Sequence, residues 1–511
     1  MRPAPRLPLA AALLLGLAAA LPAPAAAQAP PLWGELRPGP HAVGYRVEWI
    51  RDPARAWGDS AAPRPIQVSV WYPAAARAGA PRMRLRDYAH LLGAPEGRPL
   101  RTHAERRAAE RRALAVAEPP GTPGARYDTL MALEALAGHA APAAPGRFPT
   151  VVLGMGWSYE SPLAQVVLAE YLASRGYLVA APTLVGTRSP LVAVGAADLE
   201  TEVRDLEQVL ARVRGLPGAD AGRSALVGFD LGGMAATLLA MRRPETDAVV
   251  SLDSGILSDR LMRDLMRPSP FYRLDRLRMP LLHATRTREE NLARGLGEDR
   301  AVFDSAAGPR WLLRVRGMRH ADFAIHGMVE GVLPAFWGPV QGTPHRGHAA
   351  TLRLVAAFLD AHLKDDAEAR ALLLRDPAEW APPGAALALE RTGPVAGAGV
   401  PDADEVAHTV LTRGAAAVES GGRPVMDEAA FRALGYELLW RRGDAAGAAR
   451  VFGWAAEALP RSAGVRVDLG DALLARGDRA GALAAFRRAL ELDPDHAEAK
   501  ARLAEMGVVE S

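Results

Sequence analysis

The chain has 511 residues, of which 49% are hydrophobic, so it can bury a large core and has room for roughly two to four domains. Its 61 basic and 58 acidic residues leave a net charge of only +3, which argues against a nucleic-acid-binding protein. The absence of cysteine excludes disulfides, thiolate metal sites and lipid-modified cysteines.

Residues 1–27 have the pattern of a secretory signal peptide. Arginines near the start precede an apolar stretch over 7–21, and small residues lead to an expected cleavage site near Gln28. The apolar stretch is short and contains Gly16, which argues against a retained membrane anchor. We therefore expect an exported protein, periplasmic or secreted, with no membrane span once the signal is removed.

The next segments alternate between strand-like and helical patterns. Two runs, 41–50 and 66–73, predict an antiparallel opening, and residues 82–140 form an Arg/Ala-rich helical excursion. Further strands are expected at 149–156, 177–183, 224–230, 248–254, 279–285 and 311–317, with helices at 162–175, 197–214, from 231 onward and at 351–363. Short runs of Val, Leu and Ala without alternation are typical of strands buried on both faces. The pattern predicts an α/β domain over residues 36–365, with a mostly parallel sheet and helices on both faces.

A change in composition follows this domain. Residues 381–405 are rich in Pro, Gly and Ala, so we expect a linker there and a separate domain over 406–511. Its sequence repeats itself, because a shift of 34 residues places 436–465 over 470–499 and aligns the RGD, Phe, Ala, Glu and Pro positions. This period and the helical patterning resemble the tetratricopeptide repeat.

The resemblance to tetratricopeptide repeats implies an all-α domain with a capping helix at 497–508. The first repeat departs from the pattern, because Gly435-Tyr436 stands where the second repeat has Leu469-Gly470. Helical repeats form concave surfaces, so a protein or peptide partner is expected.

The segment VGFDLGG, residues 227–233, carries the strongest chemical signal. It joins an apolar strand to a small-residue helix, which is the setting of a nucleophile elbow. Gly228 and Gly232 remove side chains that would clash where strand and helix pack closely. The elbow position itself holds Asp230 instead of serine, and no Gly-x-Ser-x-Gly occurs elsewhere in the chain. Aspartate tolerates the left-handed backbone of such a turn better than most residues.

Two further residues complete a candidate triad in the order expected for this elbow. Asp253 follows the next strand and His320 follows the last one, so both lie where open α/β sheets hold their ligands. The backbone N–H groups of Leu231 and Trp157 are the expected oxyanion donors. The sequence suggests no cofactor and no metal site.

Residues 36–365 resemble the α/β-hydrolases related to platelet-activating-factor acetylhydrolase and dienelactone hydrolase. The resemblance rests on GPHAVGYRVEWIRDPAR, RPIQVSVWYPA, FPTVVLGMGWSYES, LAEYLASRGYLVAAPT, VGFDLGG, VSLDSG and RHADF. It implies the α/β-hydrolase fold and cleavage of carboxylic esters through a serine, with Asp230 at the nucleophile position, Asp253 as the acid and His320 as the base. The sequence departs from the family at the nucleophile itself, and at Met155, where relatives often carry histidine.

Three interpretations of Asp230 follow. In the first, its carboxylate occupies the oxyanion donors, which favour its charged form, and His320 protonates beside it, so the site stabilises its own resting state. In the second, Asp230 is the nucleophile, as in haloalkane dehalogenases and epoxide hydrolases, and Tyr272 could serve an epoxide. Against this, Leu231 stands where those families often have Trp, and residues 255–278 are few for a cap.

In the third interpretation, Asp230 is a general base for water and His320 the acid. Taken together, we expect impaired or altered hydrolase activity toward an ester or another small apolar electrophile. The alternatives are an active Asp-nucleophile hydrolase of epoxide or haloalkane type, and a non-catalytic scaffold.

Overall fold

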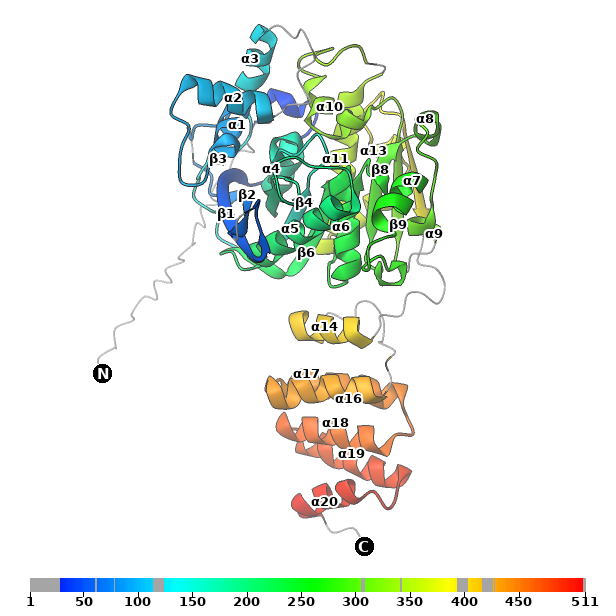
Figure 1. Ribbon diagram of the computed structural model, residues 1–511. Coiled ribbons are helices and arrows are strands. Elements are labelled where there is room, and N and C mark those ends of the chain that lie inside the picture. The colour runs from blue at the N-terminus through cyan, green and yellow to red at the C-terminus, as the bar shows by residue number, and fades with distance from the viewer. Residues whose placement is uncertain are drawn as a thin grey trace, which may run out of the picture.

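A computed structural model describes residues 28–59, 62–77, 79–113, 124–304, 308–340, 342–392, 403–415, 426 and 428–508. The predicted signal peptide lies outside the described residues. A sheet with flanking helices forms the larger part of the protein, and a stack of helices follows it (Figure 1).

The described residues form one ten-stranded sheet in the order β3-β1-β2-β5-β4-β6-β7-β8-β9-β10. Neighbouring strands from β5 to β9 are parallel, whereas β1, β2 and β10 pair antiparallel with their neighbours β2, β5 and β9. The strands are β1 (Ala42–Ala56), β2 (Pro63–Ala74), β3 (Gly138–His139), β4 (Phe148–Gly154), β5 (Leu178–Pro182), β6 (Ala219–Phe229), β7 (Ala248–Leu252), β8 (Leu281–Arg286), β9 (Arg310–Val315) and β10 (Leu387–Thr392). The predicted α/β domain with a mostly parallel sheet is confirmed.

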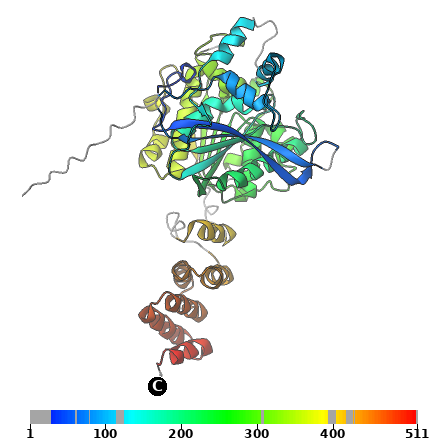
Figure 2. The same cartoon turned by 90° about the vertical axis from the view of Figure 1, so that its left-hand side faces the viewer.

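Helices cover both faces of this sheet, as Figures 1 and 2 show. Four of them pack on the central strands: α4 (Val166–Ser174), α5 (Ala196–Arg214), α6 (Leu231–Arg242) and α11 (Pro344–Leu363). The others in this domain are α1 (Leu85–Gly93), α2 (His103–Ala113), α3 (Gly124–Ala132), α7 (Asp259–Leu261), α8 (Arg288–Ala293), α9 (Ala301–Asp304), α10 (Ile325–Val329), α12 (Ala367–Leu374) and α13 (Pro377–Trp380). Within the described part of the chain, no helix has both the length and the apolar character needed to span a membrane.

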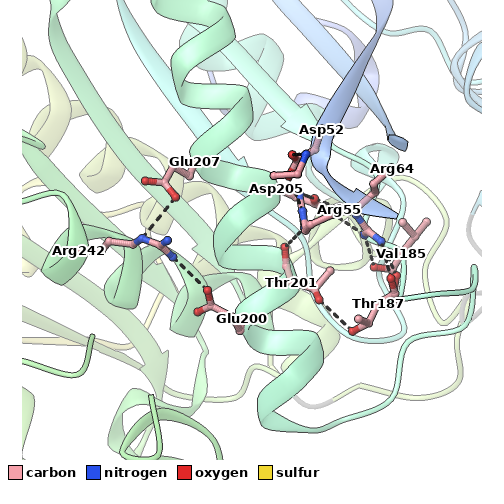
Figure 3. A network of polar contacts seen from close by, with 12 residues as sticks. Asp52, Arg55, Arg64, Val185, Thr187, Glu200, Thr201, Asp205, Glu207 and Arg242 are labelled. Atoms are coloured by element: carbon pink, nitrogen blue, oxygen red, sulfur yellow. Dashed lines mark hydrogen bonds and ion pairs between the residues drawn. The ribbon is translucent and has the colours of Figure 1, made fainter. Parts of the chain in front are cut away.

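A buried polar network fastens the β1–β2 hairpin and the loop after β5 to helix α5 (Figure 3). The guanidinium of Arg64 is fully buried, lies 2.7 Å from a carboxylate oxygen of Asp205 and donates to the carbonyls of Val185 and Gly186. Arg55 also pairs with Asp205, at 2.5 Å. Buried charges are tolerated only when each has partners, so these contacts fix the loop beside the carboxyl ends of the strands.

The sheet domain extends beyond the predicted boundary at 365. Helices α12 and α13 follow it directly, and β10 forms within residues 387–392, which the composition assigns to the linker. The linker prediction is wrong for these six residues. Leu387 and Leu389 are half-buried against the core, whereas Ala388 and Glu390 are exposed, as in an edge strand with one face on the core. Residues 393–402 of the predicted linker lie outside the described residues.

The C-terminal part consists of antiparallel helices stacked below the sheet domain in both views (Figures 1 and 2). They are α14 (Ala403–Arg413), α16 (Glu428–Tyr436), α17 (Ala445–Ala458), α18 (Ala463–Ala475), α19 (Arg479–Leu492) and α20 (Ala497–Glu505). The predicted all-α repeats are confirmed. Arg413, at the end of α14, forms an ion pair with Asp247, which precedes β7 at the amino end of the central strands.

A single π-helical turn explains the irregular first repeat. Gly435 packs against Phe452 as Gly470 packs against Phe486, because a Cβ on either glycine would lie 2.3 Å from the ring. The glycines are therefore structurally equivalent, although they are 35 residues apart and the phenylalanines 34. The extra residue is taken up at 437–441, where the N–H of Arg442 donates to the carbonyl of Glu437 at 3.1 Å.

This close approach predicts opposite effects for two glycine-to-alanine changes within the repeat helices. Gly470→Ala is expected to destabilise the repeats by about 1–3 kcal/mol, because its methyl group would displace the Phe486 ring. Gly453→Ala, in α17, meets nothing within 4 Å and is expected to stabilise by up to about 1 kcal/mol. Chemical denaturation followed by circular dichroism would measure both. Equal effects of the two changes would contradict the packing described here.

Candidate active site

The turn between β6 and α6 has the geometry of a nucleophile elbow. Asp230 stands alone between them with φ 52° and ψ −120°, a conformation that costs a non-glycine residue about 1–3 kcal/mol. Strand and helix pack backbone to backbone around it. A Cβ at Gly228 would lie 2.0 Å from the carbonyl oxygen of Gly232, and one at Gly232 would lie 2.2 Å from the carbonyl carbon of Gly154.

Asp253 and His320 meet beside this elbow. Asp253 follows β7, and its carboxylate lies 2.7 Å from Nδ1 of His320. The same carboxylate accepts hydrogen bonds from the Thr285 hydroxyl at 2.6 Å and from Nε of Arg286 at 2.9 Å. These donors orient the carboxylate, and the carboxylate in turn orients the imidazole so that its Nε2 faces Asp230.

The charges of this pair stabilise each other. Burial alone would raise the pKa of Asp253, but the hydrogen bond from His320 and the positive charge of Arg286 outweigh it and hold that pKa well below its usual range. Burial alone would lower the pKa of His320, yet Asp253 and Asp230 together raise it above its ordinary value. The imidazole is therefore protonated more readily than that of an exposed histidine.

Asp230 occupies both predicted oxyanion donors. Its Oδ2 accepts the backbone N–H of Trp157 at 2.9 Å, and the N–H of Leu231 also donates to its carboxylate. Its Oδ1 lies 3.6 Å from Nε2 of His320, too long for a hydrogen bond but within ion-pair distance. The structure thus brings together all five residues that the sequence suggested for this site.

The two oxyanion donors favour the charged form of Asp230, as expected from the sequence. The pKa of this carboxyl is nevertheless raised. Burial is the largest cause, and it outweighs the opposing effects of His320 and of the two N–H groups. The depth of the elbow, which sequence does not report, decides this balance.

Aromatic rings enclose the imidazole. The ring of Phe229 stacks on His320 with centroids 4.8 Å apart, and Tyr159 contacts it edge-on at 6.0 Å. The rings of His326 and Trp337 lie behind them, with centroids 3.9 Å apart and planes tilted by 35°. Burial lowers the pKa of His326 to about 3, so it is neutral. Among the described residues, no cluster of three or more metal-ligating side chains has the geometry to hold a metal ion.

A cavity of about 360 Å3 opens in front of the site. Asp230, Asp253 and His320 form one part of its wall, and four arginines line it as well: Arg286, Arg288, Arg294 and Arg314. Sequence reasoning missed these arginines, although the segment RTREENLAR directly after a strand was a visible signal. Tyr272 is not among the described residues that line the cavity.

A buried carboxyl group beneath the elbow was also missed. Glu202, on α5, accepts the N–H of Met155 at 2.9 Å, and its other oxygen has no hydrogen-bond partner among the described residues. Burial raises the pKa of Glu202 well above its usual range, and the nearby carboxyl of Asp230 adds to the shift. Burial therefore makes both carboxyl groups easier to protonate than exposed ones.

The pair of Asp230 and His320 predicts a measurable titration shift. Asp230→Asn is expected to lower the pKa of His320, because it removes one of the carboxylates that raise it. A folded pKa above the ordinary value of 6.5 means that the folded protein binds more protons. The stability that His320 contributes to the folded state is complete below pH 6.5 and is lost as pH rises through the folded pKa. Asp230→Asn is expected to reduce this dependence of folding stability on pH.

NMR titration of the imidazole signals would measure the shift. Glu200→Gln is the control, because it also removes one carboxylate from this domain. Glu200 forms an ion pair with Arg242, not with His320. An unchanged His320 pKa in Asp230→Asn would contradict the electrostatic coupling.

Comparisons with known proteins agree with this architecture. The family model of the tetratricopeptide repeat matches residues 437–497 and 467–507. Residues 437–507 therefore form tetratricopeptide repeats. The strand order, the parallel core and the elbow give the sheet domain the α/β-hydrolase fold.

Among solved structures, a ferulic acid esterase from Streptomyces cinnamoneus is similar, with 22% identity and a TM-score of 0.47. The match covers 63% of this chain and 91% of the esterase. A search of curated proteins finds no significant match. The specific relation to platelet-activating-factor acetylhydrolase and dienelactone hydrolase stays a prediction.

Proposed function

We propose that the α/β-hydrolase domain carries an esterase-type site that Asp230 blocks, and that the wild-type protein acts by binding rather than by ester turnover. One observation carries this proposal: Oδ2 of Asp230 accepts the N–H of Trp157 at 2.9 Å. That donor and the N–H of Leu231 are the groups that a developing oxyanion would need.

The chemistry of ester cleavage explains why this contact matters. Attack on a carbonyl places negative charge on its oxygen, and catalysis requires donors that are stronger for that oxyanion than for the ground state. Here the donors already bind the side chain of Asp230. Attack by the carboxylate itself would give a reactive anhydride, and burial reduces its charged fraction by raising the pKa of Asp230. The resting state is stabilised instead of the transition state.

A second candidate, a hydrolase with Asp230 as nucleophile, has one observation in its favour. With Oδ2 held by Trp157, Oδ1 is left facing His320 at 3.6 Å. Attack of Oδ1 on a saturated carbon, with departure of a halide ion or opening of an epoxide C–O bond, would give an ester, and its hydrolysis by water would use the same N–H donors. Against this candidate, Leu231 has an aliphatic side chain and Tyr272 does not line the cavity. Neither residue can therefore donate a hydrogen bond from an aromatic side chain to a halide or an epoxide oxygen.

Turnover assays separate the two candidates. Wild type and Asp230→Asn are assayed with 4-nitrophenyl esters, epoxides and haloalkanes. The proposal expects no turnover above background by either protein. Steady turnover by wild type that is lost in Asp230→Asn would overturn it and establish the carboxylate as the nucleophile.

We also infer export to the periplasm or beyond the cell, supported by the signal-like pattern of residues 1–27. The tetratricopeptide repeats support a role in holding a protein or peptide. Cell fractionation tests the location. Retention of the full chain in the cytoplasm would refute the export proposal.

A further inference from the structure

The cavity in front of Asp230 is lined by more cations than anions. Four arginines and His320 line it, against the carboxylates of Asp230, Asp253 and Glu298. The arginines come from the end of β8, from α8 and its C-terminus, and from β9. One side of the cavity is therefore basic, and we call Arg286, Arg288, Arg294 and Arg314 the arginine wall.

The contacts of the arginine wall leave positive charge unmatched. Asp253 is shared between Arg286 at 2.9 Å and His320 at 2.7 Å, so one carboxylate serves two cations. Glu298 is likewise shared between Arg288 and Arg314, the latter at 2.5 Å.

Arg286 and Arg294 are the two members of the arginine wall whose guanidinium groups could bind a further acceptor. The side chain of Arg286 is only 7% exposed, yet its Nη1 has no hydrogen-bond partner among the described residues. A buried donor without a partner costs about 1–3 kcal/mol. Arg294 is exposed at the rim and forms no ion pair with the residues that the structure describes. An anion entering the cavity would give Arg294 a partner and would add a second anionic partner to Arg286, whose side chain lines the same cavity.

We propose that the cavity binds a ligand bearing a carboxylate or phosphate group, which Arg286 and Arg294 recognise while the rest of the ligand faces Asp230 and His320. The volume of about 360 Å3 suits a small molecule. This inference rests on the proposed function in one respect, since both treat the cavity as a ligand site. It further specifies that the ligand is anionic, a property that a blocked esterase site does not by itself require.

Binding measurements test whether the arginine wall binds anions, independently of any catalysis. Inorganic phosphate and acetate are titrated separately into the full chain and followed by calorimetry, so that the two anion sources are distinguished. At least one is expected to bind with one-to-one stoichiometry. Arg294→Gln is expected to weaken binding by about tenfold, which corresponds to about 1.4 kcal/mol.

The matched control is Arg260→Gln. Arg260 is exposed on the neighbouring α7 and does not line the cavity, so the change alters net charge equally but leaves the site intact. Its affinity for the anion should equal that of wild type. Equal weakening in both variants would show a general charge effect and overturn the proposal, as would the absence of binding by either anion to wild type.

A second experiment uses the Asp230→Ser variant with two esters whose acyl chains both have five carbons, 4-nitrophenyl pentanoate and the mono-4-nitrophenyl ester of glutaric acid. The anionic ester is expected to have a lower KM, and Arg294→Gln in the same background should remove that preference by raising KM without changing kcat. If Asp230→Ser cleaves neither ester, the blocked-esterase proposal fails. The calorimetric titrations then still test whether the arginine wall binds an anion. Cleavage of both esters with equal KM would overturn the anionic-ligand proposal alone.

Discussion

Replacing Asp230 with serine is expected to raise hydrolysis of short 4-nitrophenyl esters by at least about 10³-fold over wild type. The change frees the N–H groups of Trp157 and Leu231 for the oxyanion and places a hydroxyl near Nε2 of His320. The Asp253–His320 pair, at 2.7 Å, is already oriented for a serine at the elbow. Loss of the Asp230 charge also removes one cause of the raised His320 pKa, so more imidazole is neutral and able to act as a base.

The double variant Asp230→Ser/His320→Ala is the control for this gain. It keeps the hydroxyl and the free donors but lacks the base, and its activity should return to near the wild-type level. Wild-type esterase activity equal to that of Asp230→Ser would contradict the view that the carboxylate blocks the site. The pH dependence of kcat/KM for Asp230→Ser should rise with pH through the pKa of His320.

The second large effect is expected at Gly232. Gly232→Ala would place a methyl carbon 2.2 Å from the carbonyl carbon of Gly154 and 2.6 Å from the amide nitrogen of Met155. Both neighbours are backbone atoms at the centre of the sheet, so no side chain can turn aside to make room. We expect a loss of stability of about 4 kcal/mol or more, or failure to fold. Thermal melting of the purified protein, together with its soluble yield, measures this.

Gly215→Ala is the matched control within the same domain. Gly215 ends α5 with φ −88°, and a Cβ there would come no closer than 3.5 Å to the carbonyl oxygen of Arg212. Its melting temperature should lie close to that of wild type. Should Gly232→Ala also melt like wild type, strand β6 and helix α6 could not pack as closely as described.

Local patterns were enough to predict the sheet domain and the position of its candidate site. Uniform apolar runs locate the parallel strands, and the glycines around Asp230 identify the elbow because close packing requires them. Chain order alone then places Asp253 and His320 at the same end of the sheet. These features depend on residues near each other in sequence or on a general topological rule.

Features that depend on three-dimensional context escaped sequence reasoning. The edge strand β10 lies in a segment whose Pro, Gly and Ala content resembles a linker, and only its pairing with β9 makes it a strand. The raised pKa of Asp230 reflects burial, which outweighs the two donors that the sequence did suggest. The π-helical turn at 437–441 became recognisable only when Gly435 and Gly470 were seen to pack on equivalent rings.

The ion pair between Arg413 and Asp247 joins the repeats to the amino end of the central strands, whereas the cavity opens at their carboxyl end. Figures 1 and 2 show the repeat stack leaving the sheet domain on that side. A macromolecule gripped by the stack would therefore leave the entrance to the cavity unobstructed. The proposed anion site and the proposed polypeptide-binding repeats therefore lie at opposite ends of the central strands, so that occupancy of one leaves the other open.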